Sequence, residues 1–253
     1  MNIVLDVGNT NIYVGVFQKD TLLCTFRTAT DLTKSSDEYA MVFRNFLEAK
    51  RLSKDDMEGI LLSSVVPPVN RALKAAIREV FGKPPLVLEM GVKTGLPIKI
   101  ENPAETGSDL IADCVGGIAK YGNSLLIVDL GTANKIIVVD KKGAFVGGVI
   151  TAGMKISMQA LAGKAINLNE TTLECPPKVI GRNTDDCINS GLIYGTKAMI
   201  KELCHQMEEE LGYPCKRILT GGYAALMKDL PNFISDPTLI LEGLNIILNK
   251  NNK

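Results

Sequence analysis

The chain begins with an alternation of apolar and polar positions that is typical of β-strands. An apolar run at residues 3–5 stops at the polar stretch DVGNTN, and apolar residues return at every second position over residues 12–16. This period of two predicts strands at residues 2–6 and 12–17 around a tight turn, and a third strand at residues 21–27. The chain is therefore expected to open with an antiparallel meander.

After the meander, the apolar spacing alternates between the period of a helix and the short runs of buried strands. Ser36 or Asp37 is positioned to cap the first helix, whose apolar face is Tyr39, Val42, Phe43, Phe46 and Leu47. The next expected elements are a strand at 59–66, a helix at 69–81, a strand at 85–89 and a helix at 108–121. In the second half, the expected elements are a strand at 125–129, a second meander, a helix near 153–166, a long helix at about 184–211, a strand at 217–219 and two more helical stretches.

The second meander repeats the first. The stretch LLIVDLGTANKIIVVDKKGAFVGGVI aligns with NIVLDVGNTNIYVGVFQKDTLLCTF when Asp129 is placed over Asp6. The positions matched at this constant offset, without gaps, are Gly131 on Gly8, Asn134 on Asn11, Val139 on Val16 and Lys142 on Lys19. Two copies indicate two similar lobes. The expected fold class is α/β with mixed sheets, with one lobe at residues 1–121 and the other at 122–253.

Composition and charge exclude several classes of function. Hydrophobic residues make up 46% of the 253 residues, which is ordinary for a globular protein. Lys+Arg and Asp+Glu both total 28 and form no basic block, so a nucleic acid partner is not expected. No apolar run approaches the roughly 20 residues that span a bilayer, and no signal-peptide pattern is visible, so we expect a cytoplasmic protein without a membrane partner. The 6 cysteines are scattered without a CxxC motif and are expected to be reduced and mostly buried.

The Asp-x-Gly turn has a mechanical use in nucleotide binding. The end of the strand is expected to aim the Asp6 carboxylate into a cleft, and the glycine is expected to let the turn take a positive φ and to leave backbone N–H groups unobstructed. With Thr10 and Asn11 as further donors, such a turn binds phosphates, and the carboxylate can hold a hydrated Mg²⁺. A plain hairpin would use the same residue types. The repeat at Asp129 favours nucleotide binding, and neither GxxxxGK[ST] nor GxGxxG occurs in the chain.

Two other stretches could contribute to a site. Thr220-Gly221-Gly222 follows a short strand, where the glycines could admit a purine or ribose or could simply form a turn. In TGSDLIAD, Ser108 is a plausible N-cap and Asp109 lies in the first helical turn. Asp109 could interact only with the helix dipole, or it could be a general base for a substrate hydroxyl. The one histidine, His205, lies among charged helical residues and is expected at the surface rather than in a catalytic role.

Together, these stretches resemble the type III pantothenate kinases. The matching motifs, in family order, are DVGNTN, SSVVP at 63–67, GSD at 107–109, DLGTA at 129–133, GG at 147–148, IGRNT at 180–184, SG at 190–191 and TGG at 220–222. Each motif is weak alone, but jointly they are specific, and the resemblance extends from residue 2 to the GL at 243–244. The resemblance implies two ribonuclease-H-like lobes of the actin, sugar-kinase and heat-shock-chaperone superfamily, in agreement with the repeat.

The resemblance also implies an activity and a set of site residues. The activity is ATP-dependent phosphorylation of pantothenate to 4′-phosphopantothenate, the first step of coenzyme A synthesis, by a homodimer that uses Mg²⁺ and K⁺ or NH₄⁺. The phosphate loop matches Asp6, Val7, Gly8, Asn9, Thr10, Asn11, Ile12 and Tyr13, and Thr132 matches another ATP contact. Asp109 matches the catalytic base. The pantothenate contacts match Gly107, Ser108, Asp109, Leu110 and, near the dimer interface, Thr184. Asp129 matches the ligand of the monovalent cation, and Asp6 is the expected Mg²⁺ ligand.

This sequence departs from the family pattern in three places. Leu110 stands where the family usually has arginine, so a charge-assisted contact worth about 1.5–3 kcal/mol is lost. Asn134 and Lys135 replace the last two residues of GTATT, and residues 151–153 lack the proline of the usual GG-x-I-x-PG. Lys135 could compensate for the arginine or could point out of the cleft.

Three functions remain compatible with this pattern. The first is an active pantothenate kinase, which the retained Asp6, Asp109, Asp129 and Thr132 favour. The second is a non-catalytic, nucleotide- or pantothenate-binding paralogue with a regulatory role, which the altered positions favour. The third is a kinase for a related small alcohol. Pantothenate-dependent ADP release separates the first from the others.

Overall fold

A computed structural model of the chain describes residues 1–164 and 169–252, and they form two compact units. The first unit comprises Met1–Leu96, Glu101–Ala119 and Thr238–Lys253, and the second comprises Pro97–Ile100 and Lys120–Pro237. The lobe boundary that the sequence predicts between residues 121 and 122 stays a prediction. The C-terminal helix α6 (Leu239–Asn251) belongs to the first unit, although it follows the second unit in sequence.

The first unit is built on a five-stranded sheet in the order β3-β2-β1-β4-β5. The strands are β1 (Asn2–Val7), β2 (Asn11–Gln18), β3 (Thr21–Ala29), β4 (Gly59–Ser64) and β5 (Leu86–Val87). Strands β1, β2 and β3 pair antiparallel as the predicted meander, whereas β1 pairs with β4 and β4 with β5 in parallel. β4 stops at Ser64, two residues before the predicted end, because Pro67 begins the next helix.

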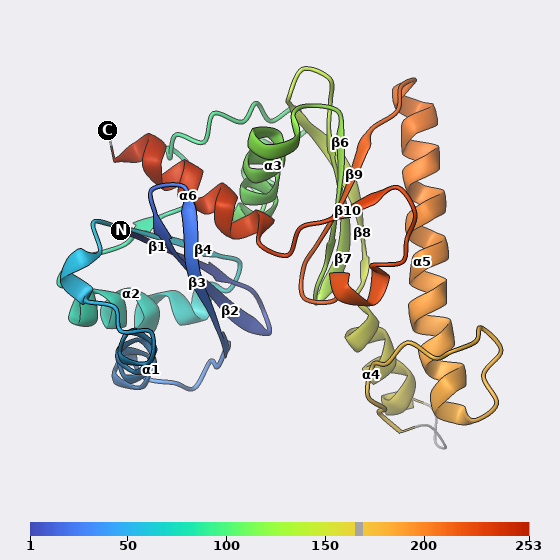
Figure 1. Cartoon of the computed structure of the whole chain (residues 1–253), viewed down its shortest axis with the longest axis horizontal. Helices are drawn as coiled ribbons and strands as arrows, with labels where there is room; N and C mark the ends of the chain where they lie inside the picture. Colours follow the sequence, from blue (N-terminus) through green and yellow to red (C-terminus); the bar gives the residue numbers. More distant parts are fainter. Residues whose placement is uncertain (165–168, 253) are drawn as a thin grey trace. The chain divides into compact units, whose positions relative to one another are not determined.

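Helices cover both faces of the first sheet, which explains the continuous apolar run in β1. Ile3, Leu5 and Val7 pack with α1 (Ser36–Ala49) and α2 (Pro67–Phe81) in one buried cluster. Helix α6 lies on the other side of this sheet from α1 and α2 (Figure 1). There, Asn2 Nδ2 donates to Asn245 Oδ1 of α6 at 2.9 Å. Since side chains alternate along a strand, both faces of β1 must be apolar or satisfied by partners.

The caps and crossings of these helices follow from particular residues. The N-cap of α1 is Ser35 rather than the predicted Ser36 or Asp37, because Ser35 and Glu38 form a reciprocal capping box. Helix α3 (Ser108–Tyr121) crosses α6 where a Cβ on Gly243 would lie 1.9 Å from the Ala112 carbonyl oxygen. The glycine therefore allows the backbones of the two helices to touch.

The second unit has a sheet of the same design, in the order β10-β9-β6-β7-β8. Its strands are β6 (Leu125–Leu130), β7 (Ala133–Val139), β8 (Phe145–Ala152), β9 (Lys216–Thr220) and β10 (Phe233–Ser235). As in the first sheet, three strands form an antiparallel meander and two join in parallel. This repeated topology confirms the predicted α/β class with two ribonuclease-H-like lobes.

The long helix α5 (Thr184–Leu211) covers the second sheet, as Figure 1 shows. Leu126 and Val128 of β6 share a buried cluster with Ile193 and Ile200 of α5. Helix α4 (Met154–Lys164) adds Met154 to this cluster. Residues 165 and 166 of the predicted helix lie outside the described residues.

The ungapped alignment of the two meanders is wrong beyond the turns. Asp6 pairs with Tyr13 across the first hairpin, whereas Asp129 pairs with Lys135 across the second. Tyr13 follows Asp6 by seven positions and Lys135 follows Asp129 by six, so the second turn is one residue shorter. Lys135 is therefore the structural counterpart of Tyr13 rather than of Ile12.

The cysteines are only partly as predicted. All are free thiols, in agreement with a reduced protein, but Cys175 and Cys187 are exposed. Cys114 and Cys204 are buried, and burial raises the pKa of the Cys204 thiol to about 12. None of the helices within 1–164 and 169–252 has the length and apolar character needed to cross a bilayer.

Candidate active site

The turn between β1 and β2 presents the predicted phosphate loop. Gly8 N–H donates to Asn11 O at 3.0 Å and closes the turn. Thr30 Oγ1 donates to Gly8 O at 2.6 Å, and Thr30 N–H donates to Thr10 O at 3.0 Å. Because a trans peptide points its N–H away from its C=O, the Asn9 N–H is turned away from Thr30. Asn9, Thr10 and Asn11 are exposed, so this loop offers polar groups to solvent or to a ligand.

The expected positive φ at the turn glycines is wrong. Neither Gly8 nor Gly131 is among the residues with positive φ. A Cβ on Gly8 would lie 3.4 Å from Asn11 O, which a small shift could accommodate. Gly8 is therefore important mainly because the absence of a side chain leaves the loop open to an approaching ligand.

A chain of hydroxyl contacts connects this loop to helix α3. Asp6 and Ser63 are register partners on the parallel strands β1 and β4. The Ser63 hydroxyl is fully buried and lies 3.4 Å from Asp6 Oδ1 and 2.9 Å from Ser108 Oγ. Ser108 is the first residue of α3, and Asp109 follows it. The structure thus brings Asp6 and the start of the GSD motif to the same end of the first sheet.

Gly107 gives the Asp109 carboxylate its room. Asp109 Oδ1 accepts a hydrogen bond from Leu110 N–H at 2.9 Å, so the carboxylate folds over the start of α3. A Cβ on Gly107 would lie 2.4 Å from the same oxygen, so any other residue would push the carboxylate away. Asp109 and Leu110 are half-buried, and the positive end of the helix dipole lies beneath them.

In the second unit, Asp129 lies against a lysine. Lys135 Nζ lies 2.9 Å from Asp129 Oδ2 in a cross-strand ion pair, and both side chains are mostly buried, at 19% and 15% exposure. Lys135 therefore points toward Asp129 and not out into solvent. Asn134, the other altered position, faces the opposite side of β7, where its Nδ2 donates to Ala152 O at 3.3 Å.

Gly221 packs against the other oxygen of Asp129. Its φ is +91°, and a Cβ there would lie 2.4 Å from Asp129 Oδ1 and 2.5 Å from Leu130 O. Both the backbone angle and the lack of space require glycine at this position. Gly222, in contrast, has no atom within 4 Å of its Cβ position. The first glycine of the TGG motif is thus explained by contacts within the protein.

The turn that carries Thr132 is held in a similar way. Gly131 N–H donates to Ala133 O at 3.1 Å, and Gly153 N–H donates to Thr132 O at 3.0 Å. A Cβ on Gly153 would lie 2.4 Å from Thr132 O, so the glycine lets β8 approach the turn without the usual family proline. Thr132 is half-buried at this turn.

The remaining predicted residues lie at surfaces of the second unit. Thr184 is the first residue of α5 and is exposed, and Asn183 caps the helix by accepting from Asp186 N–H at 2.8 Å. His205 is exposed as expected and lies 3.5 Å from Glu209. Across the described part of the chain, no cluster of three or more His, Cys, Asp or Glu side chains could hold a metal ion.

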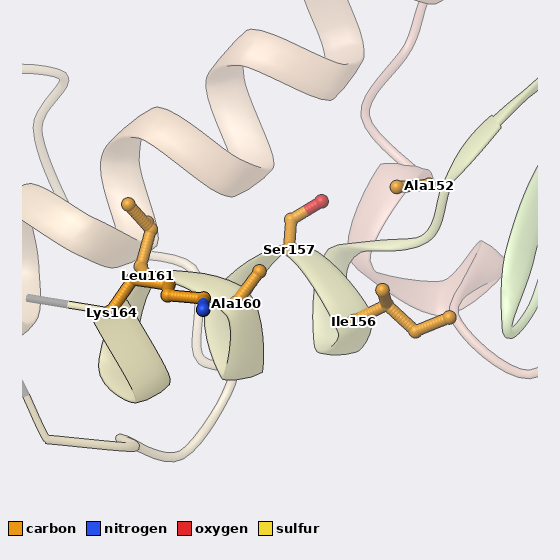
Figure 2. Close-up of a pocket in the computed structure, with 6 residues that line it drawn as sticks. All are labelled: Ala152, Ile156, Ser157, Ala160, Leu161 and Lys164. Atoms are coloured by element: carbon orange, nitrogen blue, oxygen red, sulfur yellow. The ribbon is translucent and has the colours of Figure 1, made fainter.

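An apolar hollow of about 500 Å³ lies on α4 at the end of β8. Its lining residues are Ala152, Ile156, Ser157, Ala160, Leu161 and Lys164 (Figure 2). Five of the six come from α4, and Ile156 and Leu161 are exposed. The hollow contains none of the predicted ATP or pantothenate residues.

Sequence reasoning missed several contributors to the candidate site. Ser63 was visible only as part of the SSVVP motif, because nothing in its spacing signals a contact with Asp6 or Ser108. The role of Lys135 depends on strand register, which the ungapped repeat placed one residue away. Gly107 and Gly221 depend on close approaches that appear only once the chain is folded.

Comparisons with known proteins identify the family of this chain. The family model for type III pantothenate kinase matches residues 2–206. A type III pantothenate kinase from Exiguobacterium sp. is 42% identical over 255 residues, which cover 100% of both chains. Among solved structures, a Baf family protein from Campylobacter jejuni covers 99% of this chain and 98% of its own at a TM-score of 0.62 and 20% identity. Component A of the (R)-2-hydroxyglutaryl-CoA dehydratase from Acidaminococcus fermentans has a TM-score of 0.58 at 15% identity, with coverage of 100% and 99%, and supports the fold alone. The matched model and the full-length relative together show that the chain belongs to the type III pantothenate kinase family.

Proposed function

We propose that this chain transfers the γ-phosphoryl group of ATP to the primary hydroxyl of pantothenate, which yields 4′-phosphopantothenate for coenzyme A synthesis. Family membership supports the reaction, and one observation supports the assignment of its site. The Asp6–Ser63–Ser108 contacts hold the start of α3, and with it Asp109, at the strand ends that carry the phosphate loop. A kinase needs its base and its phosphate-binding groups on one rigid frame, because positioning supplies most of the catalysis.

The loop from Asp6 to Tyr13 would hold the ATP phosphates, and Thr132 is proposed as a further ATP contact. Mg²⁺ is usually held by one or two carboxylates together with substrate phosphates, so Asp6 suffices as its protein ligand. When bound, the ion would neutralise charge on the transferred phosphoryl group. The exposed polar groups of Asn9, Thr10 and Asn11 support this assignment.

Asp109 would take the proton of the pantothenate hydroxyl as that oxygen attacks phosphorus. Its carboxylate now accepts from Leu110 N–H, and one side-chain rotation would turn an oxygen outward. Gly107, Ser108 and Leu110 would line the pantothenate site, and the N-terminus of α3 would favour the substrate carboxylate in place of the usual arginine. Thr184 would add a contact near a dimer interface.

A homodimer is the proposed assembly. Large apolar side chains of the second unit are exposed on β8, on α4 and in the segment before α5, namely Ile150, Ile156, Leu161, Val179 and Ile180. Ile156 and Leu161 are drawn in Figure 2. A second copy of the chain would cover such a surface. Sedimentation velocity tests this assembly, and a monomer at micromolar concentrations would contradict it.

ADP release coupled to pantothenate addition tests the activity. We expect turnover with wild type and a loss of at least about a hundredfold in kcat for Asp109→Asn, because general bases contribute 10²–10⁴-fold. ATP affinity should be unchanged in the variant, since Asp109 would contact only the acceptor. No pantothenate-dependent turnover, or an unaffected Asp109→Asn variant, would refute the proposal.

We do not extend the proposal to a monovalent cation at Asp129, because the Lys135 ammonium already lies against that carboxylate.

A further inference from the structure

The residues around Asp129 do not fit the monovalent cation that the family resemblance implies. Asp129 Oδ2 lies 2.9 Å from Lys135 Nζ, and Asp129 Oδ1 lies close to Gly221, where an added Cβ would be only 2.4 Å from that oxygen. A cation bound to this carboxylate would have to share it with a lysine ammonium a few ångströms away. Like charges at such a distance repel strongly in a partly buried site.

We propose that the Lys135 ammonium is a built-in replacement for this cation, so that the kinase works without K⁺ or NH₄⁺. An alkylammonium group has the same charge as K⁺ and the same hydrogen-bonding chemistry as NH₄⁺. Unlike a free cation, this ammonium cannot dissociate, because it belongs to a side chain of β7. Strand register places it beside the carboxylate, since Lys135 is the partner of Asp129 across the hairpin. The inference rests on the proposed kinase function.

The local structure holds the ammonium in place. Both side chains of the pair are more than four-fifths buried, so solvent screens their attraction only weakly. The second turn, one residue shorter than the first, is what brings Lys135 opposite Asp129. In the first hairpin the corresponding partner of Asp6 is Tyr13, which has no positive charge.

Activity in the absence of K⁺ and NH₄⁺ is the primary test. Pantothenate-dependent ADP release is measured in choline chloride while KCl or NH₄Cl replaces choline at constant ionic strength. We expect wild-type activity to vary by less than about twofold, because only general screening is left to change. A wild-type stimulation of about tenfold or more by K⁺ would overturn the inference.

Lys135→Thr restores the residue that the family usually has there. In choline we expect this variant to lose about 10- to 100-fold in kcat/KM, in line with the removal of one preorganised charge contact. K⁺ or NH₄⁺ should restore much of that loss, whereas Lys135→Arg should stay independent of K⁺. The matched control is Lys142→Thr, an exposed lysine on the β7–β8 turn, which should behave as wild type. A folded Lys135→Thr variant that gains nothing from K⁺ would overturn the inference.

A second readout separates this inference from the proposed reaction. Thermal unfolding of the protein with bound Mg-ATP requires no phosphoryl acceptor. The Tm therefore reports cation binding even if pantothenate is not the substrate. The Tm of wild type should not respond to K⁺ beyond the response to choline, and the Tm of Lys135→Thr should rise with K⁺. If Lys135→Thr does not fold, the wild-type Tm and Lys135→Arg decide the matter, and a K⁺-dependent Tm in wild type would contradict the inference.

Discussion

The buried hydroxyl of Ser63 joins the two motifs of the first unit, lying 2.9 Å from Ser108 Oγ and 3.4 Å from Asp6 Oδ1. Ser63 belongs to β4, the strand beside the central strand β1, while Ser108 starts α3 after a long connection. A fully buried hydroxyl keeps its position only when its partners keep theirs. The contact therefore fixes the helix that carries Asp109 relative to the strand that carries Asp6.

Ser63→Ala should loosen this connection. We expect a loss of about 1–2 kcal/mol in the free energy of unfolding, because the Ser108 hydroxyl loses its buried partner. kcat should fall by about tenfold, since small displacements of catalytic groups are costly. Urea denaturation and ADP release measure the two effects. Ser36→Ala, which changes a half-buried hydroxyl whose hydrogen bond to Asp37 Oδ1 lies at the surface, is the matched control, and equal behaviour of the two variants would contradict the role of Ser63.

Much of this architecture could be predicted from the chain itself. The period-two patterns at residues 2–6 and 12–17 correspond to β1 and β2, and the repeat at Asp129 revealed the second lobe. Local patterns sufficed because both sheets begin with hairpins, whose pairing is set by neighbouring residues. The assignment of α6 to the first unit could not be found this way, because it depends on contacts such as Asn2 with Asn245.

Two features of the candidate site could not be predicted from the sequence: the close approach of backbone to side chains, and the register of the strands. A positive φ was expected at Gly8 and Gly131 of the turns, whereas the glycine beside Asp129 that has one is Gly221. A single-residue difference in turn length places Lys135, and not Asn134, on the face of Asp129. No periodicity encodes such a difference, since side chains on both faces of β7 look alike in sequence until the partner strand is aligned.

Gly221→Ala should destabilise the second unit. Its φ of +91° is unfavourable for alanine, and the new Cβ would lie 2.4 Å from Asp129 Oδ1. We expect a loss of about 1–3 kcal/mol in the free energy of unfolding. Gly222→Ala is the matched control, because its Cβ would enter open space, and its effect should stay within about 0.5 kcal/mol. Similar losses at both glycines in urea denaturation would contradict the explanation.

Leu110→Arg should strengthen pantothenate binding. The variant restores the guanidinium that the family usually has beside the catalytic aspartate, and a charge-assisted hydrogen bond to a carboxylate contributes about 1.5–3 kcal/mol. We expect the KM for pantothenate to fall by about tenfold or more. Leu110→Gln, which adds a polar side chain without charge, is the control. A KM that is unchanged or raised in Leu110→Arg would show that the substrate carboxylate lies elsewhere.

Acid should weaken the second unit through Glu208 on α5. Arg217 donates to Glu208 through Nη2 at 2.6 Å and Nε at 3.1 Å, and Cys215 N–H donates at 3.1 Å. The hydrogen bonds from Arg217, followed by the one from Cys215 N–H, hold the pKa of the Glu208 carboxyl below its ordinary value of 4.5. A carboxyl whose pKa is lowered by folding stabilises the protein above its unfolded pKa. That stabilisation is lost as pH falls through the folded pKa.

Glu208→Gln should therefore be less stable than wild type at neutral pH and should lose less stability on acidification below about pH 4.5. Urea denaturation across this range measures both slopes. Glu209→Gln is the matched control, because the neighbouring Glu209 side chain is 67% exposed and should contribute little. The pair of Glu208 with Arg217 would be ruled out as a source of acid sensitivity if wild type and Glu208→Gln lost stability in parallel.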